Sequence, residues 1–213
     1  KGLADESTIF EITGEVAVTY QNGKNLYVKD ETGQILVYGS LENAYNNGDR
    51  LTGIQGSFKN YYSTYEMVAN SKSFGAATAG AVVEPTPTYI ENIVPEIQNH
   101  YILLENVTLD TENSKFIDVI DADITYYNKF AIELPEPGEY NVIAVVNYYQ
   151  AEGAEYPELQ VYPIEFVGQV TPPAEATAAT LAEALEMGAN GETGEIKFTG
   201  DVIVVYKNNR NIY

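Results

Sequence analysis

The feature that most constrains this chain is a sixteen-residue segment that occurs twice, once near each end. Residues 12–27 read ITGEVAVTYQNGKNLY and residues 198–213 read FTGDVIVVYKNNRNIY, with eight identical positions. Sequence that recurs at a fixed offset is the signature of a repeated structural unit. The offset of 186 residues is about twice the length of a small β domain, which leaves room for one further unit between the copies.

A weaker repeat marks this middle unit. Asn147-Tyr148-Tyr149 repeats Asn60-Tyr61-Tyr62, and each triplet follows a Gly-acid pair and a β-rich run. The stretches at 75–88 and 168–180 are rich in small residues and proline, so we expect flexible or extended connections without strands there. The predicted boundaries are a first unit at 1–75, a linker at 76–88, a diverged second unit at 89–168, a linker at 169–179 and a truncated third unit at 180–213.

The composition favours β-structure, because Val, Ile and 18 Tyr supply much of the hydrophobic content. Apolar and polar residues alternate along 9–20, with a bend expected near Gly14, and an Asn-Gly hairpin signal follows at Asn22-Gly23. The five strands expected in the first unit are 9–20, 25–29, 34–38, 50–59 and 65–68. Those expected in the second are 101–109, 115–120, 130–133, 138–147 and 159–166. The predicted fold class is all-β, with tandem five-stranded OB-like barrels.

The third unit is predicted to begin with the only clear helix of the chain. Thr180 can cap a helix over 180–187 before Gly188 ends it. Since the remaining residues supply only the first strands of a barrel, we expect the open strand edges of 195–213 to pair with a neighbouring molecule or a preceding unit.

The order of motifs in the first unit resembles a known family. The motifs are Thr13-Gly14-Glu15-Val16, then LYVKDETG at 26–33, ILVYG at 35–39 and GDRL at 48–51. They are similar to the OB-fold-like domains repeated in large secreted or surface-anchored proteins of Bacteroides and its relatives, which sometimes lie beside nuclease domains. The resemblance covers 6–75 and 175–213, whereas the centre agrees only in outline. It implies a fold and a secreted, periplasmic or cell-surface location, and no catalytic residues.

The residue inventory excludes the common catalytic and zinc sites. His100 is the only histidine and there is no cysteine, so Cys-His sites and zinc sites built from cysteines or several histidines cannot form. Asp118, Asp121 and Asp123 could hold calcium, but the loop glycine of a calcium site is missing and a solvated turn explains them better. The sequence thus predicts no enzyme, no catalytic residue, no metal and no cofactor.

The charge is strongly and unevenly negative. The net charge is −20, and residues 76–170 hold two basic residues against sixteen acidic ones. Nucleic acid is therefore disfavoured as a partner. No run approaches the roughly 20 apolar residues of a membrane-spanning helix.

Most of the candidate ligand-binding residues are tyrosines. On the second strand of the first unit, Tyr27 and Lys29 are expected to point outward while Leu26 and Val28 face the core. The tyrosines after the fourth strand of each unit form two further groups, and exposed tyrosine rings can stack on sugar rings or bases. The candidate ligand-binding residues are Tyr27, Lys29, Tyr61, Tyr62, Tyr65, Tyr148 and Tyr149.

Two functions remain open. The first is a non-catalytic extracellular binding or spacer module of a larger surface protein, with a glycan or a protein as its ligand. The alternative is an OB-fold accessory module that binds nucleic acid beside a secreted nuclease, through Tyr27, Lys29, Arg50 and Lys59. Steep salt dependence of binding would favour the alternative.

Overall fold

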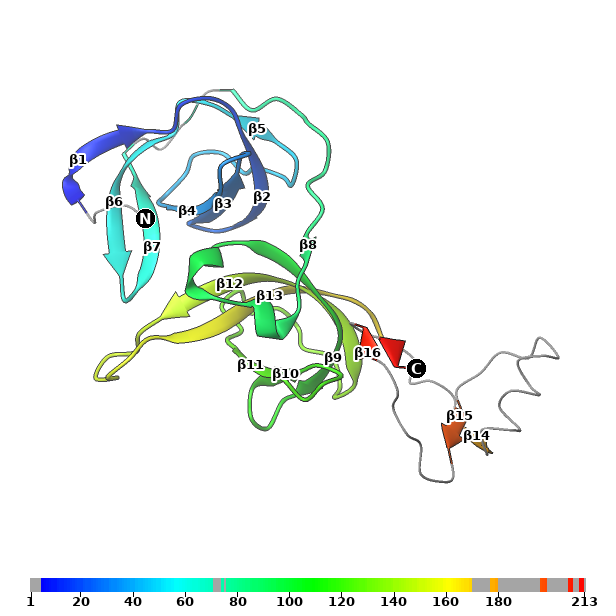
Figure 1. Ribbon diagram of the computed structural model, residues 1–213. Helices are drawn as coiled ribbons and strands as arrows, with labels where there is room; N and C mark the ends of the chain where they lie inside the picture. The colour runs from blue at the N-terminus through cyan, green and yellow to red at the C-terminus, as the bar shows by residue number, and fades with distance from the viewer. Residues whose placement is uncertain are drawn as a thin grey trace. The chain divides into compact units, whose positions relative to one another are not determined.

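A computed structural model describes residues 5–70, 74, 76–169, 177–179, 196–198, 207–208 and 211–212. The protein is predominantly β, as the sequence predicts, and its strands form two large sheets (Figure 1). Lys1–Val170 is one compact unit that holds both large sheets, and Thr171–Tyr213 is another. The predicted domain boundaries stay a prediction. The predicted helix at 180–187 and most of the predicted edge strands at 195–213 lie outside the described residues.

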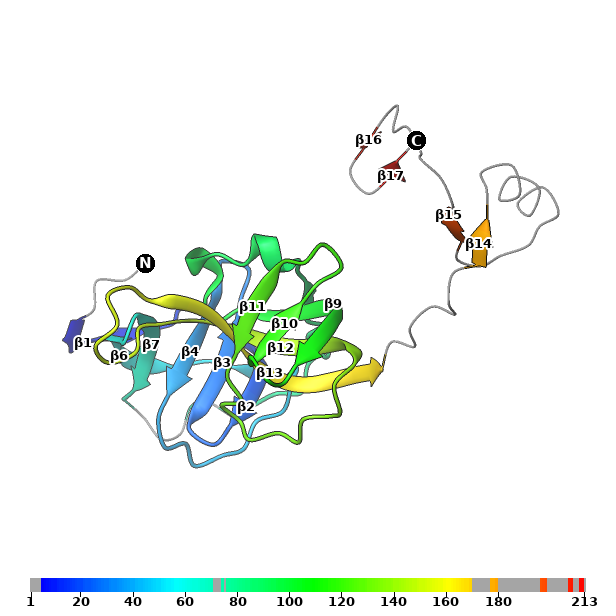
Figure 2. The same cartoon turned by 90° about the horizontal axis from the view of Figure 1, so that it is seen from below.

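The first sheet has seven strands in the order β1-β6-β7-β4-β3-β2-β5, with β4 and β7 parallel and all other pairs antiparallel. Figure 2 shows β7, β4, β3 and β2 in a row. The strands are β1 (Asp5–Glu11), β2 (Val16–Asn22), β3 (Asn25–Lys29), β4 (Gln34–Tyr38), β5 (Arg50–Leu51), β6 (Gln55–Tyr61) and β7 (Thr64–Ala69). The predicted long first strand is divided at Gly14, whose φ of +103° suits only glycine. Because of this bend, β1 pairs with β6 while β2 pairs with β3.

The second sheet has six strands in the order β10-β11-β13-β12-β9-β8. Since β9 pairs with β10 as well as with β12, five of these strands close into a ring. The parallel pairs are β11 with β13 and β8 with β9. The strands are β8 (Thr86–Pro87), β9 (Tyr101–Asp110), β10 (Lys115–Ile117), β11 (Asp123–Tyr126), β12 (Glu139–Tyr149) and β13 (Glu158–Gln169).

The third strand predicted for the second unit lies earlier in the chain than expected. We expected it at 130–133, but β11 takes that place and residues 127–138 form a loop. The amide side chain of Asn128 closes a local turn there, because it donates to the carbonyl of Ile132 at 2.8 Å and accepts the Ile132 N–H at 3.0 Å. Ala131 has a φ of +51°, which is incompatible with a regular strand.

The predicted linker at 76–88 is held in place along much of its length. Thr78 and Arg50 exchange both backbone hydrogen bonds, at 2.8 and 3.1 Å. Further along, the Asn47 side chain donates to the Val83 carbonyl at 3.0 Å and accepts the Val83 N–H at 2.7 Å. The expectation that the two stretches 75–88 and 168–180 form no strand was wrong, since β8 lies within the first and β14 (Thr177–Ala179) within the second.

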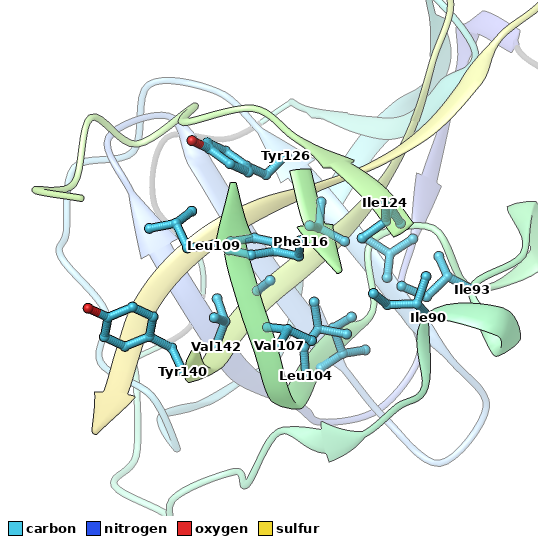
Figure 3. Close-up of a cluster of buried hydrophobic side chains, with 14 residues drawn as sticks. Ile90, Ile93, Leu104, Val107, Leu109, Phe116, Ile124, Tyr126, Tyr140 and Val142 are labelled. Atoms are coloured by element: carbon cyan, nitrogen blue, oxygen red, sulfur yellow. The ribbon is translucent and has the colours of Figure 1, made fainter. Parts of the chain in front are cut away.

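Each sheet encloses its own apolar cluster. Val18, Leu26 and Met67 are among the fully buried members in the first sheet. Figure 3 shows the second cluster, in which Phe116 is completely buried between β9, β11 and β13. Two short 3-10 turns before β9, namely η1 (Ile90–Asn92) and η2 (Pro95–Ile97), contribute to this second cluster.

The described residues of the second sequence copy pair as they do in the first. In the first copy, Gln21 pairs with Leu26 and Asn22 with Asn25. Between β16 (Lys207–Asn208) and β17 (Asn211–Ile212), Lys207 pairs with Ile212 and Asn208 with Asn211. These positions are equivalent in the aligned segments, so the two hairpins share one register at the pairs described.

Candidate functional site

The outward face of β3 and β4 is covered by the second sheet. A buried cluster joins Tyr27 and Leu36 of the first sheet to Phe130, Val145 and Tyr162 of the second half of the unit. Only 2% of the Tyr27 surface is exposed, and burial, followed by the nearby phenols Tyr162 and Tyr20, raises its pKa far above the ordinary value. Tyr27 does point away from its own sheet's core, but the expectation that it is an exposed stacking residue is wrong.

Polar contacts fix the β6–β7 hairpin against the end of β12. The Thr64 hydroxyl donates to the Asn147 side-chain oxygen at 2.8 Å, and the Gln150 N–H donates to the Tyr62 carbonyl at 2.8 Å. Both Thr64 and Asn147 are buried. These bonds bring the two predicted tyrosine groups, which are 87 residues apart in the sequence, to one place.

The three tyrosines that meet there form what we call the tyrosine ridge: Tyr61, Tyr62 and Tyr149. The Tyr61 and Tyr62 rings lie 4.8 Å apart at 87°, and the Tyr62 and Tyr149 rings lie 5.7 Å apart at 46°. Tyr61 and Tyr62 keep 46% and 43% of their surface exposed. The ridge thus exposes part of two tyrosine side chains at the place where the β6–β7 hairpin meets the end of β12.

The turn that carries the ridge has an uncommon backbone. Tyr62 and Ser63 have φ values of +49° and +72°, a conformation that two-residue hairpins usually reach with Asn or Gly. The Asn60 side chain accepts the Ser63 N–H at 2.8 Å and so supports the turn. A bulky residue at positive φ costs of order 1–3 kcal/mol, and such residues cluster at ligand sites.

The ridge has basic and aromatic neighbours, and of these only Lys59 was considered from the sequence. The ammonium of Lys59 lies 5.7 Å from the centre of the Tyr61 ring, and that of Lys129 lies 5.8 Å from the Tyr162 ring. The exposed Tyr127 ring contacts Tyr162 at 5.9 Å. Tyr162 itself is buried, and burial raises its pKa, with Tyr149 and Tyr127 adding to the effect.

The other predicted tyrosines lie near the ridge without joining it. The Tyr65 backbone is held by the second half of the unit, since its N–H donates to the Gln98 side chain at 2.7 Å and its carbonyl accepts from Asn99 at 2.9 Å. The Tyr148 carbonyl accepts from Thr64 at 3.2 Å. Within the described part of the chain, neither ring has an aromatic partner.

A buried carboxylate lies beneath this region. Glu66 on β7 is only 6% exposed. Burial raises its pKa, and the positive charges of Lys59 and Lys129 partly offset that effect. Lys59 and Lys129, which lie near the Tyr61 and Tyr162 rings, therefore also interact with a buried acid.

Lys29 lies in a separate cleft of about 820 Å³ on the first sheet. Lys29 and Arg50 flank Ala17 on the neighbouring strands, and both line the cleft. Three acidic residues line it too, namely Glu15, Asp30 and Glu31. Hydrogen bonds, first of all from the Thr32 hydroxyl, hold the pKa of Asp30 below its usual value, so this carboxylate stays charged. The cleft therefore has no excess of positive charge.

The remaining polar candidates have structural partners. Asp118 accepts the backbone N–H groups of Ile120 and Ala122, both at 3.0 Å, and Asp123 pairs with Lys115 at 2.7 Å. Among the described residues, no three His, Asp or Glu side chains gather as ligands for a metal ion. Burial, with a smaller effect of Lys29, lowers the pKa of His100.

In the part of the chain that the structure describes, no helix has the length and apolarity to cross a bilayer. Comparison of the chain with protein-family models, curated proteins and solved structures found no match.

Proposed function

We propose that this chain is a non-catalytic binding module of a larger secreted or surface protein, and that it contacts a glycan through the tyrosine ridge. The observation that carries the proposal is the convergence of Tyr61, Tyr62 and Tyr149 from the two sheets into one half-exposed cluster. Tyrosine suits a carbohydrate ligand, because its ring packs on the apolar face of a sugar while its hydroxyl bonds to sugar hydroxyls.

The strand orders support the proposed tandem OB-like barrels. Five strands of each sheet have the same connectivity: β2, β3, β4, β6 and β7 in the first sheet, and β9 to β13 in the second. In both sets the third and fifth strands are parallel, namely β4 with β7 and β11 with β13. The Asn-Tyr-Tyr triplets also fall at equivalent places, where β6 and β12 end. The location outside the cytoplasm is proposed from the family resemblance alone.

The nucleic-acid alternative has less support. Its stacking residue Tyr27 is buried, and Lys59 lies 3.8 Å from the carboxylate of Glu6. Lys29 and Arg50 share their cleft with three acids. A chain with a net charge of −20 would also repel a phosphate backbone.

A polysaccharide-binding screen tests the proposal. The chain is titrated with soluble polysaccharides of plant, bacterial and host origin by affinity electrophoresis and calorimetry, and with single-stranded DNA at physiological salt. We expect binding to at least one polysaccharide and none to DNA. For the polysaccharide that binds, Tyr62→Ala should weaken affinity about tenfold, the effect of losing a contact worth about 1.4 kcal/mol.

Tyr156→Ala is the matched control. Tyr156 is 70% exposed on the loop between β12 and β13, and among the described residues it has no ring partner. Its replacement should leave the affinity unchanged. Equal losses from Tyr62→Ala and Tyr156→Ala, or micromolar binding of DNA, would contradict the proposal.

A further inference from the structure

An apolar pocket of about 240 Å³ opens at one end of the first sheet. The side chains that line it come from the interior of the sheet: Ile12, Val16, Val28, Ile35, Phe58 and Met67. Small-molecule sites usually have volumes of about 300–1,000 Å³. The pocket is therefore better matched to one or two inserted side chains than to a whole small ligand.

The corresponding end of the second sheet is filled. Ile35 and Ile124 occupy equivalent positions, because each lies at the start of the strand that follows the second hairpin turn, β4 or β11. Beside Ile124, Figure 3 shows Ile90 and Ile93, which are only 7% and 5% exposed. Both come from the segment immediately before β9, and Ile97 packs against the same cluster. A short turn-forming segment thus inserts isoleucines where the first sheet has its pocket.

We propose that the pocket of the first sheet is an acceptor for a short apolar segment of a second polypeptide, with isoleucine or leucine side chains about three residues apart. The occupant would bind as residues 90–97 do in the second sheet. Insertion of two such side chains removes the pocket's apolar lining from water, which supplies the favourable free energy of binding.

Lys29 and Asp30 give the rim of the pocket one charge of each sign. Lys29 lines the pocket, and among the described residues it makes no ion pair. The carboxylate of Asp30 accepts hydrogen bonds from Thr32 and Gly33 and stays charged, so the rim has no excess of positive charge. Residues 90–97 read IENIVPEI, and their three isoleucines have the apolar spacing that the pocket would select.

Met67 makes the test direct. The chain has two methionines, and one of them, Met67, lines the pocket. The full chain with ¹³C-methyl methionine is titrated with a synthetic peptide of residues 88–98. We expect a saturable shift of the Met67 methyl signal, with a dissociation constant of about 1 mM or below.

Two variants and one control peptide decide the outcome. A peptide with its three isoleucines replaced by serine should cause no shift. Lys29→Glu should weaken binding several-fold without unfolding the chain, because this side chain is partly exposed. Ile35→Phe, which fills the pocket, should abolish binding. The proposal is overturned if Met67 does not respond at several millimolar peptide, if the serine peptide binds equally well, or if Lys29→Glu binds as tightly as the wild type.

Discussion

Phe130→Ala tests whether the two sheets behave as one unit. Phe130 lies on the loop between β11 and β12, and its ring is placed between aromatic residues of both sheets. The ring centres of Tyr20, Tyr162 and Tyr27 lie 4.9, 6.0 and 6.3 Å from that of Phe130. Because Phe130 is absent from the apolar clusters inside the two sheets, its removal weakens the contact between them and leaves both interiors intact.

The expected cost follows from burial. Truncation of a buried phenylalanine to alanine costs about 3–5 kcal/mol. Since 8% of Phe130 remains exposed and the cavity left behind borders a loop, we expect the lower end, about 3 kcal/mol. For a chain of this length that corresponds to a fall in Tm of roughly 6–12 °C.

Urea unfolding followed by tyrosine fluorescence and by circular dichroism measures this cost. Phe10→Ala is the control, because Phe10 is 38% exposed and, among the described residues, its ring partner is Phe58, at 5.0 Å. We expect a loss of about 1 kcal/mol or less for the control. The reasoning is refuted if Phe130→Ala costs no more than Phe10→Ala, or if the wild-type residues 5–169 unfold in two separate steps.

Three further changes probe the same structure. Thr64→Val leaves the buried Asn147 oxygen without its donor and should cost about 1–3 kcal/mol in urea unfolding, whereas an unchanged midpoint would show that the bond contributes nothing. Glu66→Gln removes a carboxyl whose pKa is raised by burial. The wild-type protein should lose stability as the pH rises from the ordinary pKa of 4.5 through the raised value, because the buried carboxyl then becomes charged. Glu66→Gln should therefore raise the Tm more at pH 7 than at pH 4, and an equal rise at both pH values would contradict this sign. Gly56→Ala places a methyl group against the Val68 carbonyl and should cost at least ~2 kcal/mol, while Gly33→Ala, which meets open space, should change the melting temperature little.

Local features of the fold could be predicted from the sequence. The bend at Gly14, the hairpin after β2 and the turn at Asp30 each depend on a few adjacent residues with special backbone chemistry. Alternation also assigned Leu26 and Val28 to the interior, where both are buried. Such signals are strong because the interactions that fix them are short in sequence.

Features that depend on distant contacts could not be predicted. Alternation places Tyr27 on the outward face of β3, but the side chains that cover it, Phe130 and Tyr162, lie more than 100 residues away. The same contact explains the misplaced strand, since the alternating apolar residues after Asn128 serve the contact between the sheets. The candidate site was predicted in pieces for this reason. Each tyrosine group was found separately, and only the docking of the β6–β7 hairpin on β12 joins them.

An aromatic NOE between the rings of Tyr62 and Tyr149 shows whether both sheets contribute to a single tyrosine ridge. A sample labelled only in its tyrosine rings gives the spectrum, and Tyr62→Phe and Tyr149→Phe identify the two signals. With ring centres 5.7 Å apart, the account predicts a clear cross-peak in the free protein at neutral pH. Well-resolved signals of both rings with no cross-peak between them would contradict it.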